Sequence, residues 1–343
     1  MLTLVFFTTD IHGSEKCWIK FLNAAEFYKA DVIIMGGDIT GKLIVPIIEQ
    51  KNGTYTTSVF GNDYVLKSKE EVEEMKNKIR FSGYYPYVCD ESEVEELEAD
   101  RSKVDKLFDV LMVEELKRWL NMVDGRVDKK VKVIVSPGND DRFVIDDAIK
   151  ESDRVIYPEE RVVEIDRYHE MISCCWSNPT PWNSPREVSE KELEKKLETE
   201  FKRVDNYDNL ICNFHVPPYK SNLDLAPKLD KNLRVKYVFG KPEFIPVGSK
   251  ALRKLIKKYE PKLGLHGHIH ESAGEKKYKR TLCLNPGSEY GEGILKGYLI
   301  ELTKDGIKKY WRVDGYPIRT PPHRSRAGCT LLMNTCFSRF NPF

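Results

Sequence analysis

Histidine is scarce in this chain, with only seven in 343 residues. Cysteine is hardly commoner, at eight, and no two cysteines form a Cys-x-x-Cys pair. So few unpatterned cysteines in a long chain exclude a disulfide framework. Cys17, Cys212 and Cys283 lie in apolar runs, so we expect reduced core thiols and a cytoplasmic protein.

Net charge is almost absent too, because 55 basic residues oppose 54 acidic ones. This balance argues against a nucleic-acid partner, which needs a basic field. No apolar run is long enough to span a membrane. The first ten residues, MLTLVFFTTD, predict a buried strand and not a signal peptide, because they lack a basic leader and a cleavage site. No pattern in the sequence specifies an oligomeric state.

Three of the seven histidines fall within the stretch LHGHIH at 265–270. Alternate positions of an extended segment point to one side, so His266, His268 and His270 are expected to share a face. Imidazole is the commonest metal-binding side chain, and a polar strand end is the structural alternative. This fragment alone leaves the two interpretations balanced.

The order of apolar and helical patterns predicts an α/β fold. Residues 3–8 read as a strand, 14–30 as a helix and 31–38 as a second strand, which is typical of parallel βαβ pairing. Further core strands are predicted at 131–135, 154–157, 161–165, 169–176, 209–213 and 263–265, and further helices at 187–203 and 248–259.

Residues 41–130 interrupt this alternation. They predict a hairpin turning at Asn52-Gly53 and helical stretches at about 68–80 and 91–122. We expect this block to be an insertion or an elaborated crossover within one domain at 1–315. Residues 316–343 are rich in Pro, Arg and Ser without periodicity, which predicts a disordered tail.

Polar side chains follow five of the apolar runs. In an open α/β sheet, ligands bind outside the carboxyl ends of the strands, so these side chains are expected to converge. They are Asp10, His12, Asp38, Asn139, His215, His268 and His270. Carboxylate, imidazole and amide donors suit divalent ions and not copper(I) or an iron–sulfur cluster. Seven ligands are more than one tetrahedral zinc ion can bind, and about the number that two ions need. Two ions about 3.5–4 Å apart can clamp a phosphoryl group.

The order Asp10-x-His12, Gly37-Asp38, Gly138-Asn139, His215, Gly267-His268-x-His270 resembles the calcineurin-like metallophosphoesterases over about residues 1–312. HGHIH followed by NPGS at 285–288 resembles the Icc-like phosphoesterase branch. The resemblance implies a four-layer α/β/β/α sandwich of two mixed β-sheets flanked by helices. It implies that one metal is held by Asp10, His12, Asp38 and His270. The other would be held by Asp38, Asn139, His215 and His268, with Asp38 bridging and a bridging hydroxide as the nucleophile.

One position departs from the family. Many members carry a histidine directly after the Asn, where it contacts substrate and can protonate the leaving group, and this chain has Asp140 there. Branches with a non-histidine residue followed by Asp are typically phosphodiesterases. We therefore expect good leaving groups to be preferred, with His266 as a substitute acid or, alternatively, a buried histidine. Asn139 and Arg142 are the candidate substrate contacts, and a surface ion pair is the alternative for Arg142.

These features predict a dinuclear metal-dependent phosphodiesterase that acts on a small-molecule or nucleotide phosphoester. Manganese is the favoured metal, and iron, nickel, cobalt and zinc are alternatives. A nuclease of the same family is a second hypothesis, which the neutral charge disfavours. A binding or scaffold protein that has lost catalysis is a third, and the complete set of ligand positions argues against it.

Overall fold

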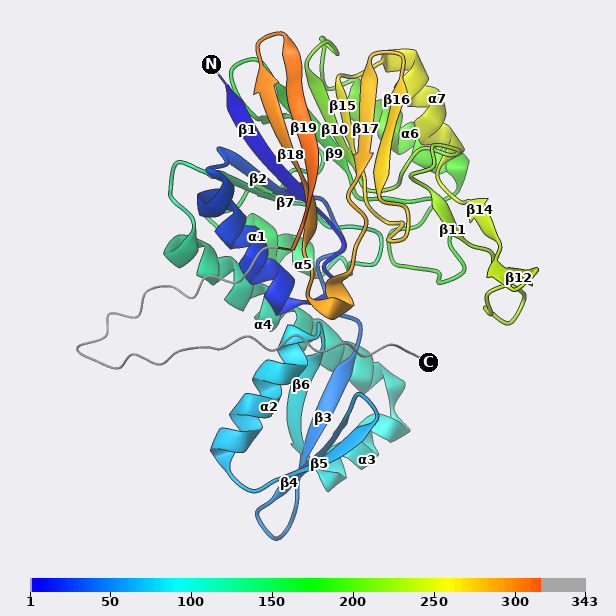
Figure 1. Ribbon diagram of the computed structural model, residues 1–343. Coiled ribbons are helices and arrows are strands. Elements are labelled where there is room, and N and C mark those ends of the chain that lie inside the picture. Colours follow the sequence, from blue (N-terminus) through cyan, green and yellow to red (C-terminus); the bar gives the residue numbers. More distant parts are fainter. Residues whose placement is uncertain (1, 316–343) are drawn as a thin grey trace.

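The computed structural model describes residues 2–315, and its first sheet is built around the apolar strand β1 (Thr3–Thr8) (Figure 1). This strand pairs in parallel with β2 and antiparallel with β18. The sheet has the order β19-β18-β1-β2-β7. Its other strands are β2 (Val32–Met35), β7 (Lys132–Val135), β18 (Lys296–Thr303) and β19 (Gly306–Asp314).

A second sheet has the order β16-β17-β15-β10-β9-β8. Its four central strands are parallel, and the two edge strands are antiparallel to their neighbours. The strands are β8 (Val163–Glu164), β9 (Glu170–Cys174), β10 (Leu210–Phe214), β15 (Leu263–Leu265), β16 (Gly274–Tyr278) and β17 (Thr281–Asn285).

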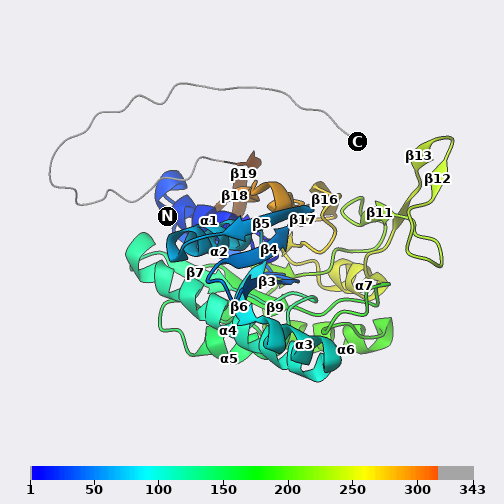
Figure 2. The same ribbon diagram turned by 90° about the horizontal axis from the view of Figure 1, so that it is seen from below.

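The two mixed sheets pack face to face. Val5 and Ile34 of the first sheet share a buried cluster with Ile211 and Leu265 of the second. Helices α1 (Glu15–Tyr28), α4 (Arg101–Arg126) and α5 (Ile145–Lys150) cover the outer face of the first sheet. Helices α6 (Glu190–Phe201) and α7 (Lys250–Tyr259) cover that of the second. The predicted four-layer α/β/β/α sandwich is confirmed, and Figures 1 and 2 show its layers.

The residues between β2 and β7 form a third sheet below the sandwich in Figure 1, of order β5-β4-β3-β6. Its strands are β3 (Ile44–Glu49), β4 (Tyr55–Val59), β5 (Asn62–Leu66) and β6 (Tyr85–Asp90), and helices α2 (Lys69–Phe81) and α3 (Glu91–Ala99) accompany it. This part has its own buried cluster, which includes Ile47 and Ile79. Helix α4 joins it to the sandwich, because Trp119 stacks on Trp18 of α1 at 5.3 Å between ring centroids.

Three local predictions can be compared with this structure. The hairpin turn at Asn52-Gly53 is confirmed, since β3 and β4 pair antiparallel on either side of it. The single helix expected at 91–122 is wrong. Asp100 is extended between α3 and α4, and its carboxylate accepts the N–H of Ser102 and so begins a new helix. The strand expected at 154–157 is a single bridge between Ile134 and Ile156.

Two short antiparallel strand pairs, here called the protruding ladder, follow β10 in the sequence and project from the second sheet. It consists of β11 (Leu225–Pro227) with β14 (Phe244–Pro246), and β12 (Tyr237–Val238) with β13 (Lys241–Pro242), and it protrudes from the body in both views (Figures 1 and 2). Within residues 2–315, no helix combines the length and apolar character that crossing a bilayer requires. The predicted disordered tail, 316–343, lies outside the described residues.

Candidate metal centre

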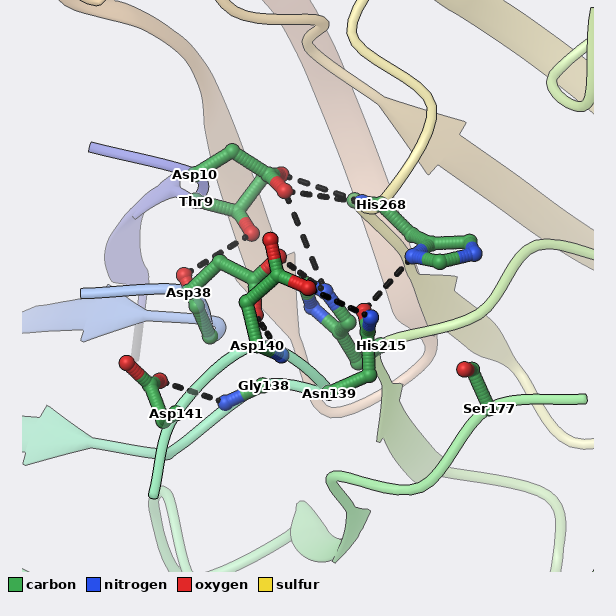
Figure 3. Close-up of polar contacts among 12 residues, drawn as sticks. Thr9, Asp10, Asp38, Gly138, Asn139, Asp140, Asp141, Ser177, His215 and His268 are labelled. Carbon is green, nitrogen blue, oxygen red and sulfur yellow. Dashed lines mark hydrogen bonds and ion pairs between the residues drawn. The ribbon is translucent and has the colours of Figure 1, made fainter. Parts of the chain in front are cut away.

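The seven candidate ligands lie at the carboxyl ends of strands from both sheets. Figure 3 shows Asp10, Asp38, Asn139, His215 and His268 among them. The two sheets meet here, because the ring Nδ1 of His215, after β10, lies 3.2 Å from the carbonyl oxygen of Gly36, after β2. The carbonyl oxygen of His215 in turn accepts the N–H of Gly267, after β15, at 2.9 Å. Segments that are distant in the sequence therefore close on one region.

Asp38 lies between two imidazoles. Its Oδ2 is 3.2 Å from His215 Nε2 and 3.8 Å from His12 Nε2. Around it, three groups of side chains bring their donor atoms within 4.8 Å of one another. The groups are Asp10 with His12 and His270, Asp38 with His215 and His268, and His12 with Asp38 and Asp140.

Further contacts join the groups. His270 Nε2 is 3.4 Å from Asp10 Oδ1 and 3.0 Å from His12 Nε2. Asn139 Oδ1 is 2.6 Å from His268 Nδ1, and the backbone N–H of His268 donates to Asp10 Oδ1 at 3.0 Å (Figure 3). The structure thus brings together all seven residues that the sequence proposed as ligands.

Four of these residues have left-handed backbone conformations. The φ angles are 55° at Asp10, 38° at His12, 51° at Asp38 and 67° at His268. Such conformations cost about 1–3 kcal/mol each and gather at functional sites. Backbone hydrogen bonds hold two of them, since the N–H groups of Asp10 and His12 donate to the carbonyl oxygens of Gly37 and Asp38 at 2.9 Å. These backbone conformations direct the four side chains into the space where the donor atoms gather.

Glycine is required at two positions of the centre. A Cβ atom at Gly138 would collide with the carboxylate and backbone nitrogen of Asp38, and one at Gly267 with the carboxylate of Asp10. These close approaches explain the Gly-Asn and Gly-His pairs in the sequence motifs.

The donor atoms fit divalent cations. His12 Nδ1 is buried without a hydrogen-bond partner among the described residues, although polar groups are rarely buried that way. His215 Nε2 is buried too, and it faces the carboxylate of Asp38 at 3.2 Å. Asp10 and Asp38 bring buried carboxylates to the same space. Mixed imidazole and carboxylate donors suit first-row divalent metals, so the residues present fit the two ions that the sequence motifs imply.

The electrostatics of the cluster follow from burial. Burial raises the pKa of Asp10, but His270, His215 and His12 outweigh it and hold the pKa below its usual range. Burial and His215 lower the pKa of His268 to about 3. An ionised Asp10 and a neutral His268 are the forms that bind metals. Burial raises the pKa of Asp38 to about 6. His215 opposes this rise, and repulsion from Asp140 and Asp10 adds to it.

Asp140 faces this centre and is held by Asn139 and by two residues that the sequence did not indicate, Lys42 and Ser184. Lys42 forms an ion pair with its Oδ2, and Ser184 Oγ donates to its Oδ1. Asn139 Nδ2 also donates to Oδ1, at 3.0 Å. Burial raises the pKa of Asp140, but Lys42 and His12 lower it to about 2 overall, so the carboxylate is ionised at neutral pH. The sequence could have indicated Lys42, because it lies in the same loop after β2 as Asp38.

Two sequence candidates lie outside these groups. The guanidinium of Arg142 pairs with Asp105 and Asp109 of α4, each at 2.9 Å. The ring of His266 is fully buried with Nδ1 2.7 Å from the carbonyl oxygen of Phe214, and burial lowers its pKa to about 4. Arg142 therefore forms the ion pair, and His266 is the buried histidine, that the sequence left open as alternatives.

The NPGS segment supports the histidine loop. Asn285 Nδ2 donates to the carbonyl oxygens of Gly267 at 3.3 Å and Ile269 at 3.0 Å. Ser288 Oγ donates to the carbonyl oxygen of Asp10 at 2.6 Å. These bonds tie the histidine loop to the β1 loop.

No family model matches the chain. The uncharacterized protein MJ1162 of Methanocaldococcus jannaschii is 30% identical over 179 residues, which cover 52% of this chain and 70% of that protein. One solved crystal structure superposes with a TM-score of 0.54 at 16% identity, covering 90% of this chain and 98% of its own. TT1561 of Thermus thermophilus superposes with a TM-score of 0.48 at 13% identity, covering 92% and 99%. The chain belongs to the family of MJ1162, and it shares the fold of the solved structure that superposes with a TM-score of 0.54.

Proposed function

We propose that this protein is a dinuclear metal-dependent phosphodiesterase of the Icc-like type. The position of Asp38 between His12 and His215 is the observation that carries the proposal, because one carboxylate can then serve two ions. Asp10, His12, Asp38 and His270 would hold one ion, and Asp38, Asn139, His215 and His268 the other. Manganese is the favoured metal, with iron, nickel, cobalt and zinc as alternatives. When bound, the ions supply an activated water and neutralise phosphoryl charge.

The surroundings of Asp140 favour diesters over monoesters. An ionised carboxylate repels a phosphomonoester dianion more strongly than a phosphodiester monoanion. Lys42 offsets this charge and has a half-exposed side chain, so its ammonium group can also contact a phosphate oxygen. Asn139, which donates to Asp140 and accepts from His268, would lie beside the same phosphate.

Leaving-group protonation is weak in this proposal. Asp140 carries no proton at neutral pH, and the fully buried His266 is outside the ligand groups. The substrate is a small-molecule or nucleotide diester with a leaving group stable as an anion.

The experiment is a metal analysis combined with hydrolysis of bis(p-nitrophenyl) phosphate and p-nitrophenyl phosphate in the presence of manganese. We expect two ions per chain and faster turnover of the diester. Asp38→Asn should lose metal and more than about 100-fold in activity, because the shared ligand is weakened. Asp63→Asn, on an exposed position of β5, is the matched control. Faster monoester turnover would contradict the diesterase assignment, and bound metal without turnover would favour a scaffold.

A further inference from the structure

A hollow of about 360 Å³ lies beside the metal centre, where the sandwich meets the third sheet. Its walls include Phe60 from the turn between β4 and β5, Tyr84 from the segment before β6, and Tyr290 from the short helix η1 (Tyr290–Glu292). Figure 1 draws η1 in orange directly above the third sheet. The sandwich and the third sheet, each with its own buried cluster, thus form one aromatic-lined space.

Tyr290 belongs both to this hollow and to the rim of the metal centre. Its ring centroid is 4.7 Å from that of His12 and 5.8 Å from that of His270. A phosphate held at the centre would therefore place one of its ester substituents at the mouth of the hollow.

The hollow has the chemistry of a site for a flat, uncharged ring. Phe60 is 50% exposed although it is a large apolar side chain, and its ring centroid is 5.8 Å from that of Tyr84. Nucleic-acid bases stack on such exposed aromatic rings. Glu289 and Glu292 also line the space. The carboxylate of Glu289 is paired with Lys296, so Glu292 is the acid that can repel a phosphate here and accept a hydrogen bond from an exocyclic amino group.

We propose that this hollow binds the amino-bearing nucleobase of a nucleotide phosphodiester whose phosphate lies at the metal centre. This inference rests on the proposed function and names its substrate class. Phe60 and Tyr84 would provide the stacking surfaces, and Glu292 would repel the phosphate from the hollow. The third sheet would then determine specificity, since it supplies Phe60 and Tyr84.

The kinetic test compares two diesters with the same leaving group, the p-nitrophenyl ester of adenosine 5′-monophosphate and methyl p-nitrophenyl phosphate. The ratio of their kcat/KM values measures recognition of the nucleoside. We expect Phe60→Ala to lower this ratio about tenfold through loss of stacking, and Phe60→Trp to preserve it. Phe239→Ala, at a fully exposed position far out on the protruding ladder, is the control. A ratio that Phe60→Ala leaves unchanged overturns the inference.

A binding test separates this inference from the proposed function. Titration calorimetry would compare adenosine 5′-monophosphate with ribose 5-phosphate on the wild-type protein, with no turnover required. We expect the nucleotide to bind about tenfold more tightly and Phe60→Ala to abolish the difference. Equal affinities would overturn the nucleobase site even if both diesters are hydrolysed. A difference that Phe60→Ala removes would support it even if neither is hydrolysed.

Discussion

The carboxylate of Asp141 accepts a hydrogen bond from the backbone N–H of Thr40 at 2.9 Å, which joins the loop after β7 to the loop after β2. Its other oxygen accepts the N–H groups of Gly138 at 2.8 Å and Ile39 at 3.1 Å. The side chain is fully buried, so it replaces water as the partner of these donors. Because Asp38 adjoins this network, Asp141 fixes the distance between the two loops that carry the candidate ligands Asp38 and Asn139.

We therefore expect Asp141→Asn to lower the free energy of unfolding by about 3 kcal/mol. The substitution removes the negative charge from several buried hydrogen bonds and turns an amide N–H group towards a backbone donor. Urea denaturation at neutral pH measures the change. Asp147→Asn, at an exposed position of α5, should stay within about 0.5 kcal/mol of the wild type. Equal destabilisation by both substitutions would argue against the network.

The convergence of the seven candidate ligands could be predicted from sequence because each follows an apolar run. Burial on both faces requires such runs to be core strands, and parallel strands deliver their carboxyl ends to one edge. Asp10 and Asp38 after β1 and β2 are the plainest case. The sheet arrangement itself came from the family resemblance, since strand order is not encoded in any single run.

The surroundings of Asp140 could not be predicted in this way. Ser184 lies in an irregular segment without periodicity, and its contact with Asp140 depends on how that segment crosses the β7 loop. Tyr290 reaches His12 only through the packing of η1 against the β1 loop. The break at Asp100 was missed because apolar spacing continues through it, while one side-chain hydrogen bond decides the boundary.

The ionised state of Asp140 predicts a strong dependence on the leaving group. For a series of aryl methyl phosphates, log kcat/KM should fall steeply as the pKa of the leaving phenol rises, because no proton is supplied. Asp140→His should make the slope shallower, since a neighbouring imidazolium can protonate the departing oxygen. Asp105→His on α4 should keep the wild-type slope. A flat dependence in the wild-type protein would refute this account of Asp140.

Removing Lys42 should weaken substrate binding. Its ammonium group pairs with Asp140, and without it an uncompensated carboxylate faces the phosphate. We expect Lys42→Ala to raise KM for bis(p-nitrophenyl) phosphate about tenfold, which corresponds to about 1.4 kcal/mol. Steady-state kinetics would measure it, with Lys51→Ala at an exposed turn as the matched control. An unchanged KM would remove Lys42 from the phosphate site.

Stability should fall with rising pH because of Glu200, on the buried side of α6. Burial raises its pKa from 4.5 to about 7, with repulsion from Glu159 and Glu160 adding to burial and Arg203 opposing it. A carboxyl group with a higher pKa in the folded state binds its proton more tightly when folded, so its ionisation opposes folding progressively between pH 4.5 and about 7.

Glu200→Gln removes this ionisation and provides the test. The free energy of unfolding of the variant minus that of the wild type should be larger at pH 8 than at pH 5, by on the order of 1 kcal/mol. The ion pair with Arg203 exists only at pH 8, where Glu200 is ionised, so its loss in the variant reduces the expected difference. Thermal unfolding at the two pH values gives the comparison, and Glu170→Gln at an exposed position controls for the change of charge. A stability difference that is the same at pH 5 and pH 8 would show that Glu200 does not titrate in this range.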